Sequence, residues 1–176
     1  AFGYAVNASA KTIAAAINTN AASQGVTATA LNSATLSGLS IAGTVSFTLG
    51  GTSTAAISAV VTDPTDLTAM VSAINGAAGS TGITATFTNT SAKNNITLTS
   101  SDGSNITIEN FLNTNGTTAT TATDSINFSG VTLDDASGAT ADSSTKIGTV
   151  SLASSKGTIT LANAETDVFG TATQTS

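Results

Sequence analysis

The chain has 176 residues, a formal net charge of −6, 8% charged and 4% aromatic residues, and no cysteine, histidine or tryptophan. Without cysteine or histidine it cannot form a disulfide, a zinc finger, a haem or iron–sulfur ligand set, or a Ser-His-Asp triad. Its four basic residues, all lysines, are scattered and give no cationic stripe for phosphates or anionic lipid. We therefore expect no cofactor, no nucleic-acid partner and no membrane partner.

The composition predicts a folded, strand-rich protein. Hydrophobic residues make up 40% of the chain, and roughly a third of it is serine or threonine. Valine and isoleucine alternate with threonine, which suits a pleated surface with one wet face. Such cysteine-free, weakly charged chains are common among bacterial surface and appendage proteins, so we expect an extracellular location.

The sequence contains a repeat. When Ile17-Asn18 is placed over Ile74-Asn75, the offset is 57 residues, and Gly25 and Gly82 fall into line at the same offset. In both copies the glycine opens the sequence Gly-Val/Ile-Thr-Ala-Thr. The chain therefore predicts two copies of one structural unit.

The second copy predicts an amphipathic helix about three turns long. Apolar residues spaced at i, i+3, i+4 and i+7 form its buried face: Leu67, Met70, Val71 and Ile74. We expect Asp63 to cap the helix, Pro64 to take its first position and Asp66 to lie in its first turn. Gly76 is expected to adopt a left-handed conformation that ends it.

The first copy repeats this face with smaller side chains, and Ser9 is its expected cap. The face consists of Ala10, Ile13, Ala14 and Ile17. We interpret both Ile-Asn pairs as architectural: the isoleucine anchors the last helical turn to a sheet. The asparagine either tolerates a left-handed backbone or bonds the free carbonyls at the helix end.

After each helix the apolar period changes to two, which predicts half-buried strands. The alternating positions are Val26/Ala28/Ala30, Val45/Phe47/Leu49, Ile57/Ala59/Val61, Ile83/Ala85/Phe87, Ile96/Leu98 and Ile106/Ile108. Gly50-Gly51 and residues 101–104 read as hairpin turns between such strands. Each unit is therefore predicted to be a hairpin, a helix and a three-stranded meander.

The rest of the chain predicts a loop at 113–124 followed by further strands, with no third helix. The strand-like positions are Ile126/Phe128, Val131/Leu133, Ile147, Val150/Leu152 and Ile159/Leu161. The expected fold class is α+β and strand-rich, with two small units, each an antiparallel sheet or meander backed by one short amphipathic helix.

The order of an apolar helix ending in Ile-Asn, the Gly-Val/Ile-Thr-Ala-Thr strand and a strand pair around Ser-Asp-Gly resembles the IN motif of bacterial flagellins. The second copy, 67–109, matches this pattern well, whereas the first departs from it at 36–41, where no Asp-Gly turn occurs. The resemblance implies the surface-exposed variable outer region of flagellin (D2/D3), a non-enzymatic part of the filament that serves motility and forms an antigenic surface.

The resemblance also implies an arrangement and partners. The long polymerising helices of flagellins are absent, so we expect a monomeric fragment whose parent contacts other flagellin subunits through missing domains. A base unit is expected at 1–43 plus 122–176, and an inserted distal unit at 44–121. Both ends, near Tyr4–Asn7 and Val168, should lie close together. Host antibodies and surface glycans are further expected partners.

Other readings of the same residues stay open. The filament-cap (hook-associated) protein carries the same motif, and a surface adhesin could grip host glycan. Asp134, Asp135 and Asp142 could bind calcium, but their spacing fits neither an EF-hand nor a nonapeptide repeat, so we expect an acidic surface turn and no metal.

Two further features have ordinary explanations. Asp63 and Asp66 resemble a catalytic carboxylate pair but are explained by the start of a helix. The aromatic residues near the ends, Phe2, Tyr4 and Phe169, are expected to pack rather than bind ligand. The motif positions that we single out are therefore structural, and no catalytic, cofactor or metal residue is predicted.

Overall fold

The computed structural model describes residues 8–114, 124–135 and 141–159. The helical elements are α1 (Ala10–Ala21), the 3₁₀ turn η1 (Ala22–Gln24), α2 (Thr68–Gly76) and α3 (Ala78–Thr81). The strands are β1 (Val26–Ser37), β2 (Gly43–Gly50), β3 (Thr54–Val61), β4 (Ile83–Asn89), β5 (Ala92–Ser100), β6 (Ile106–Thr114), β7 (Ser125–Phe128), β8 (Val131–Asp134), β9 (Ser144–Lys146) and β10 (Thr149–Ser154). The expected strand-rich α+β class with two antiparallel sheets is confirmed.

Several expectations fall on residues outside the described ranges. They are the strands near Tyr4–Asn7 and Val168, the placement of both ends, the packing of Phe2, Tyr4 and Phe169, and the strand position Leu161. Most of the predicted loop at 113–124 also lies there, although β6 extends to Thr114.

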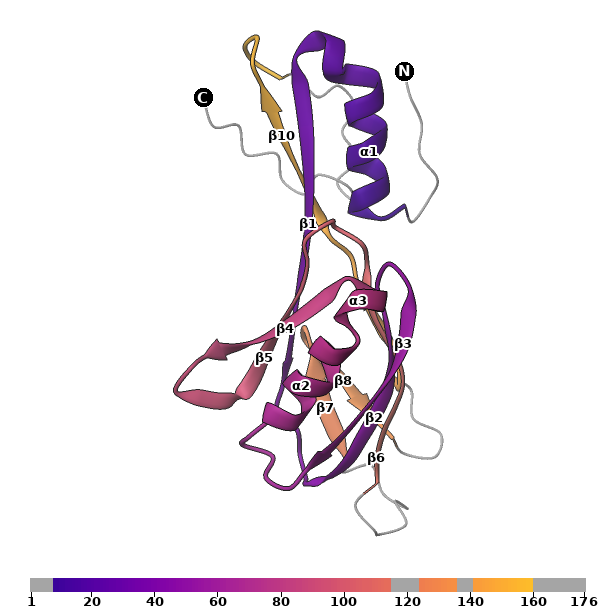
Figure 1. Ribbon diagram of the computed structural model, residues 1–176, viewed down its shortest axis with the longest axis vertical. Coiled ribbons are helices and arrows are strands. Elements are labelled where there is room, and N and C mark those ends of the chain that lie inside the picture. Colours follow the sequence, from indigo (N-terminus) through magenta and orange to yellow (C-terminus); the bar gives the residue numbers. More distant parts are fainter. Residues whose placement is uncertain (1–7, 115–123, 136–140, 160–176) are drawn as a thin grey trace.

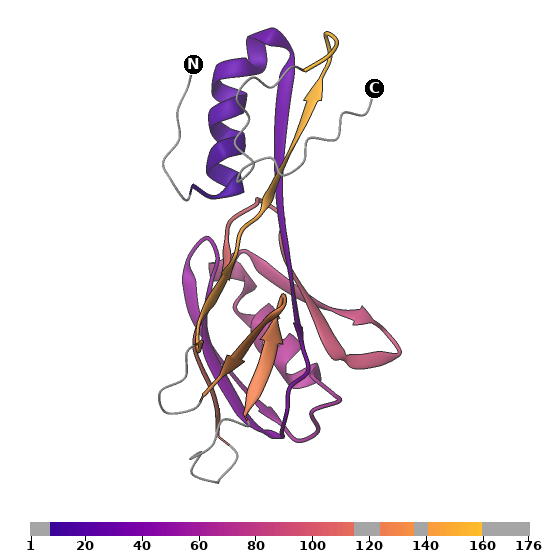
Figure 2. The ribbon, with the colours of Figure 1, turned by 180° about the vertical axis from the view of Figure 1, so that it is seen from behind.

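The described structure has two parts, and the long strand β1 runs from one into the other (Figures 1 and 2). Its first half, 26–31, pairs with β10 and is covered by α1; we call this part the helix lobe. Its second half, 32–37, pairs with β5 in a sheet of order β4-β5-β1-β7-β8. That sheet and a second one, of order β3-β2-β6-β9, form the sandwich lobe.

The sandwich lobe holds the larger hydrophobic core, between its two sheets. Fully buried side chains come from both sheets and from α2, and include Leu36, Leu49, Met70, Ile74, Ile83, Ile96, Leu98, Ile106, Ile108, Ile126 and Phe128. Helix α2 contacts both β3 and β4, which are edge strands of different sheets. It therefore closes one open side of the sandwich.

The helix lobe has a separate and smaller core. Ile13, Ala14 and Ile17 of α1 pack on Ala28 of β1, and partly buried apolar residues surround them. A two-stranded ribbon is only marginally stable alone, so this lobe depends on its helix and on continuity with the sandwich.

The periodicity of the sequence predicts these faces correctly. Ser9 caps α1 by accepting the Thr12 N–H, and the predicted helical face is buried. The alternating positions of β2, β3, β5 and β6 also point into the core. Gly50-Gly51 belongs to the expected hairpin, between β2 and β3.

The start of the second helix differs from the expectation, because α2 begins at Thr68 rather than beside Asp63. Asp63 and Pro64 instead open a turn in which the Asp66 N–H donates to the Asp63 carbonyl. The Asp63 carboxylate accepts from Thr65 within this turn, and Asp66 accepts the N–H of Thr68, the first helical residue. The fixed φ of proline suits the second position of a turn as well as the first position of a helix. The same residues therefore fit both structures.

The end of this helix also differs. Gly76 is its last residue and has no positive φ; the left-handed glycine is Gly82, with φ +70°. The unpredicted short helix α3 separates the two glycines and ends at Gly82, whose N–H donates to the Ala78 carbonyl. The chain therefore turns toward β4 six residues later than the sequence predicts.

The expected three-stranded meander is wrong in its last step. β5 pairs with β4 and β1, whereas β6 pairs with β2 and β9 in the other sheet. The turn at 101–104 is therefore a crossing between sheets rather than a hairpin. The sequence of this turn predicts that the chain reverses, but it does not predict which strand β6 pairs with.

The two glycines give a matched pair of substitutions. Gly82→Ala places a side chain at φ +70° and 3.0 Å from Thr52 Oγ1, so we expect a loss of roughly 1 kcal/mol or more of unfolding free energy. Gly76→Ala meets nothing within 4 Å in a helical backbone and should gain about 0.5–1 kcal/mol. Urea denaturation measures both, and equal effects of the two changes would contradict the assignment of the left-handed turn to Gly82.

Candidate functional site

The asparagine of the first Ile-Asn pair joins helix α1 to strand β1. Asn18 Nδ2 donates to the Ala28 carbonyl at 2.8 Å, and the Ala28 N–H donates to Asn18 Oδ1 at 2.7 Å. The side-chain amide thus makes both hydrogen bonds that a neighbouring strand would make with that residue. Beside it, Ile17 is buried in the core of the helix lobe.

The second pair repeats this arrangement between α2 and β4. Asn75 Nδ2 donates to the Ala85 carbonyl at 2.9 Å, and the Ala85 N–H donates to Asn75 Oδ1 at 2.8 Å. Ile74 is fully buried beside it. In both copies the asparagine and the alanine are ten residues apart, so we call the pair of hydrogen bonds the Asn–Ala clamp.

The clamp satisfies backbone groups that no strand reaches. β4 is the last strand of its sheet, with β5 on its other side, so Ala85 directs its N–H and carbonyl toward Asn75 at the free edge. Ala28 lies opposite Leu152 of β10 and likewise directs both groups away from that strand. Covering an edge in this way removes a site for unwanted strand pairing.

The observed role of asparagine corrects the expectation from sequence. Neither Asn18 nor Asn75 has a positive φ, and their amides bond a strand rather than the helix-end carbonyls. The left-handed conformation belongs to Gly25 and Gly82, with φ +78° and +70°. These glycines reverse the chain so that the strand returns alongside its own helix.

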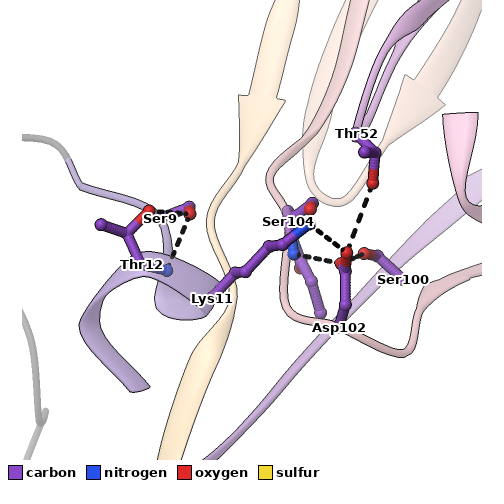
Figure 3. Close-up of polar contacts among 8 residues, drawn as sticks. Ser9, Lys11, Thr12, Thr52, Ser100, Asp102 and Ser104 are labelled. Atoms are coloured by element: carbon purple, nitrogen blue, oxygen red, sulfur yellow. Dashed lines mark hydrogen bonds and ion pairs between the residues drawn. The ribbon is translucent and has the colours of Figure 1, made fainter. Parts of the chain in front are cut away.

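A polar cluster connects the two lobes (Figure 3). Lys11 Nζ of α1 donates to Asp102 Oδ2 at 2.6 Å, and the Lys11 N–H donates to the Gly103 carbonyl at 3.2 Å. Asp102 also accepts the N–H of Ser104 and the hydroxyls of Ser100 and Thr52. Lys11 above all, followed by Ser104 and Ser100, holds the pKa of the Asp102 carboxyl well below its usual range.

Close backbone packing surrounds this cluster. A Cβ on Gly103 would lie 2.3 Å from Ala30 Cβ, and one on Gly148 would lie 2.8 Å from the Leu31 carbonyl oxygen. Between them, buried Asn32 donates from Nδ2 to the carbonyls of Ser104 and Lys146. The two lobes therefore meet through a tightly packed junction.

The predicted acidic turn is tied into the fold by its backbone. The Asp134 N–H donates to the Ala141 carbonyl, and the Asp142 carbonyl accepts the Phe111 N–H. Asp135 Oδ2 accepts the Asn113 N–H at 3.2 Å. Over residues 8–114, 124–135 and 141–159, no group of three or more Asp, Glu, Cys or His side chains is placed to hold a metal ion.

The carboxylates of Asp63 and Asp66 are likewise used locally. Each accepts from a threonine two residues later, and these hydrogen bonds lower the pKa of each carboxyl.

A search of the described residues for a helix long and apolar enough to cross a membrane found none.

A known protein family matches most of the second copy of the repeat and the hairpin before it. Residues 44–102 match the family model described as the flagellin hook IN motif. The match covers about a third of the chain and contains β2, β3, α2, β4 and β5, together with the Asn75–Ala85 clamp. No curated protein matches this chain significantly.

The chain thus carries a structural repeat of the flagellar filament system. Specifically, it contains a flagellin IN motif, consistent with a flagellin outer-domain protein. The motif supports a flagellin-type structural role and an association with the filament, outside the cell.

Removing one clamp tests its contribution to stability. Asn18→Ala leaves the Ala28 N–H and carbonyl without their partner, so we expect the unfolding free energy to fall by about 1–3 kcal/mol. Asn20→Ala in the same helix, where the amide bonds only Ala16 on an exposed surface, is the control and should cost less than about 0.5 kcal/mol. Equal losses for both variants, measured by urea denaturation, would contradict the clamp.

The Lys11–Asp102 pair predicts a dependence of stability on pH. The pKa of Asp102 is depressed in the folded state, so its stabilising contribution is present above the unfolded carboxyl pKa of about 4 and is lost as pH falls below it. Asp102→Asn should therefore lose less stability than the parent chain between about pH 7 and about pH 3. Urea titrations at both pH values measure this, and parallel losses would show that the pair contributes nothing.

Proposed function

We propose that this chain is the surface-exposed variable outer region of a flagellin, a structural part of the filament that carries out no catalysis. The observation that carries this proposal is the match of residues 44–102 to the flagellin IN motif. The first Asn–Ala clamp, between Asn18 and Ala28, extends the same helix-to-strand design to residues 10–28, which the family model does not cover.

The surface chemistry fits a role in contact with solvent. On the outer side of one sheet, hydroxyl side chains face one another across three strands: Thr84, Thr99 and Ser33 in one row, and Thr86, Thr97 and Thr35 in the next. Several of them are exposed, and none is charged. Such a face stays hydrated without forming salt-sensitive charge pairs.

The division into a base at 1–43 plus 122–176 and a distal unit at 44–121 is part of this proposal. An inserted unit needs its two ends side by side, and Thr44 of β2 pairs directly with Thr114 of β6. In this proposal the two units share one core, because β7, β8 and the second half of β1, which belong to the base, complete the sandwich formed by the distal unit.

In the intact protein we propose that other flagellin subunits are the partners, contacted through domains outside this chain, and that the chain alone is monomeric. Host antibodies and surface glycans would meet its exposed faces. The filament-cap protein is the second candidate, because the matched motif is described as a hook motif. A glycan-binding adhesin is a third and would be retained on a glycan array.

Labelling of cells tests these proposals. Antibodies raised against this chain should decorate filaments along their entire length in immunogold electron microscopy, and labelling should disappear after absorption with the purified chain. Gold confined to filament tips would favour the cap protein, and absence of gold from filaments would contradict both flagellar assignments.

A further inference from the structure

The two clamped asparagines differ in the residue that follows them. Asn75 is followed by Gly76, whereas Asn18 is followed by Thr19. A glycine lacks the side chain that shields the backbone nitrogen, so Asn-Gly is the dipeptide most prone to attack of that nitrogen on the asparagine side chain. The two copies therefore share a geometry but not a reactivity.

Asn75-Gly76 is open to solvent and yet held in an unreactive geometry. Both residues are exposed, and a Cβ on Gly76 would meet nothing within 4 Å. The Asn75 amide, however, is fixed on Ala85 by two hydrogen bonds, and Gly76 has the helical backbone of the last residue of α2. The side chain cannot swing onto the Gly76 nitrogen until both bonds break and the last turn of α2 unwinds.

We propose that Asn75-Gly76 is a latent site of self-modification, protected while α2 is docked on β4 and converted irreversibly when the end of α2 opens. The deprotonated Gly76 nitrogen attacks Asn75 Cγ, the bond from Cγ to the side-chain nitrogen breaks, and ammonia leaves. One water molecule then opens the cyclic imide to give aspartate or isoaspartate. The net reaction consumes water and releases ammonia, and no other reactant is needed.

The product cannot rebuild the clamp. A carboxylate at residue 75 still accepts the Ala85 N–H but has no proton to donate to the Ala85 carbonyl, so two oxygens face each other there. Isoaspartate also lengthens the backbone in the last turn of α2. Since α2 closes the side of the sandwich between β3 and β4, the modification loosens that side while leaving the clamp of Asn18 intact.

The rate of modification tests this proposal. The chain is incubated in mildly alkaline buffer with and without denaturing urea, and conversion at residues 75 and 18 is followed by peptide mapping and isoaspartate detection. We expect Asn75 to convert roughly tenfold or more slowly in the folded chain than in urea or in a peptide spanning 71–79. Asn18 should be slow in both states. Equal rates at Asn75 in both states would overturn the protection by docking.

A second variant separates the clamp from its surroundings. Thr19→Gly creates an Asn-Gly pair in the first clamp, at an exposed helical position. Asn18 should then become fast in urea and stay protected in the folded chain, as Asn75 does. Rapid conversion of Asn18 in the folded variant would show that the clamp gives no protection.

The effect of the product is measured separately. Ion exchange separates deamidated chains by their additional negative charge, and peptide mapping selects those converted at residue 75 rather than at the other Asn-Gly pair of the sequence, Asn115-Gly116. The chain converted at residue 75 should show faster hydrogen exchange in α2 and unchanged exchange in α1. The variant Asn75→Asp should recover part of its lost stability, relative to the parent chain, as pH falls and the protonated carboxyl donates to Ala85. Unchanged exchange in α2 would overturn the proposed loosening.

Discussion

One side-chain amide in each copy completes the hydrogen bonding of a strand that has no neighbour on that side. Asn18 and Asn75 each replace a missing strand at a single residue, and the isoleucine before each one buries the same helical turn. An unbonded edge beside a helix leaves buried or half-buried polar groups without partners, which is costly. The position of the helix on its sheet is therefore set by hydrogen bonding as well as by apolar contact.

A second constraint fixes the lobes to each other. Gly103 and Gly148 permit backbone approach where any side chain would collide, and Asn32 bonds the carbonyls of both crossing segments. The ion pair of Lys11 with Asp102 lies at the rim of this junction and is about half exposed. Because exposed pairs contribute little free energy, the close packing rather than the charge sets the geometry.

The sequence predicts the buried faces well because burial follows directly from periodicity, as at Ile13 and Ile17 in α1 or Ile96 and Leu98 in β5. It fails where the same local signal serves two structures: Asp63 and Pro64 suit a turn as well as a helix start. It also fails for the turn at 101–104, because turn residues do not specify which strand comes next. One feature of the sequence does point to the clamp: in both copies an alanine follows the asparagine by ten residues.

The continuity of β1 has a mechanical consequence. Its 12 residues span about 40 Å, with six registered pairs to β10 followed by six to β5. Ladder hydrogen bonds lie perpendicular to the strand. A pull along the strand therefore loads many of them in shear at once, rather than peeling them apart singly. A force applied along β1 is therefore transmitted to both lobes together, through the strand that they share.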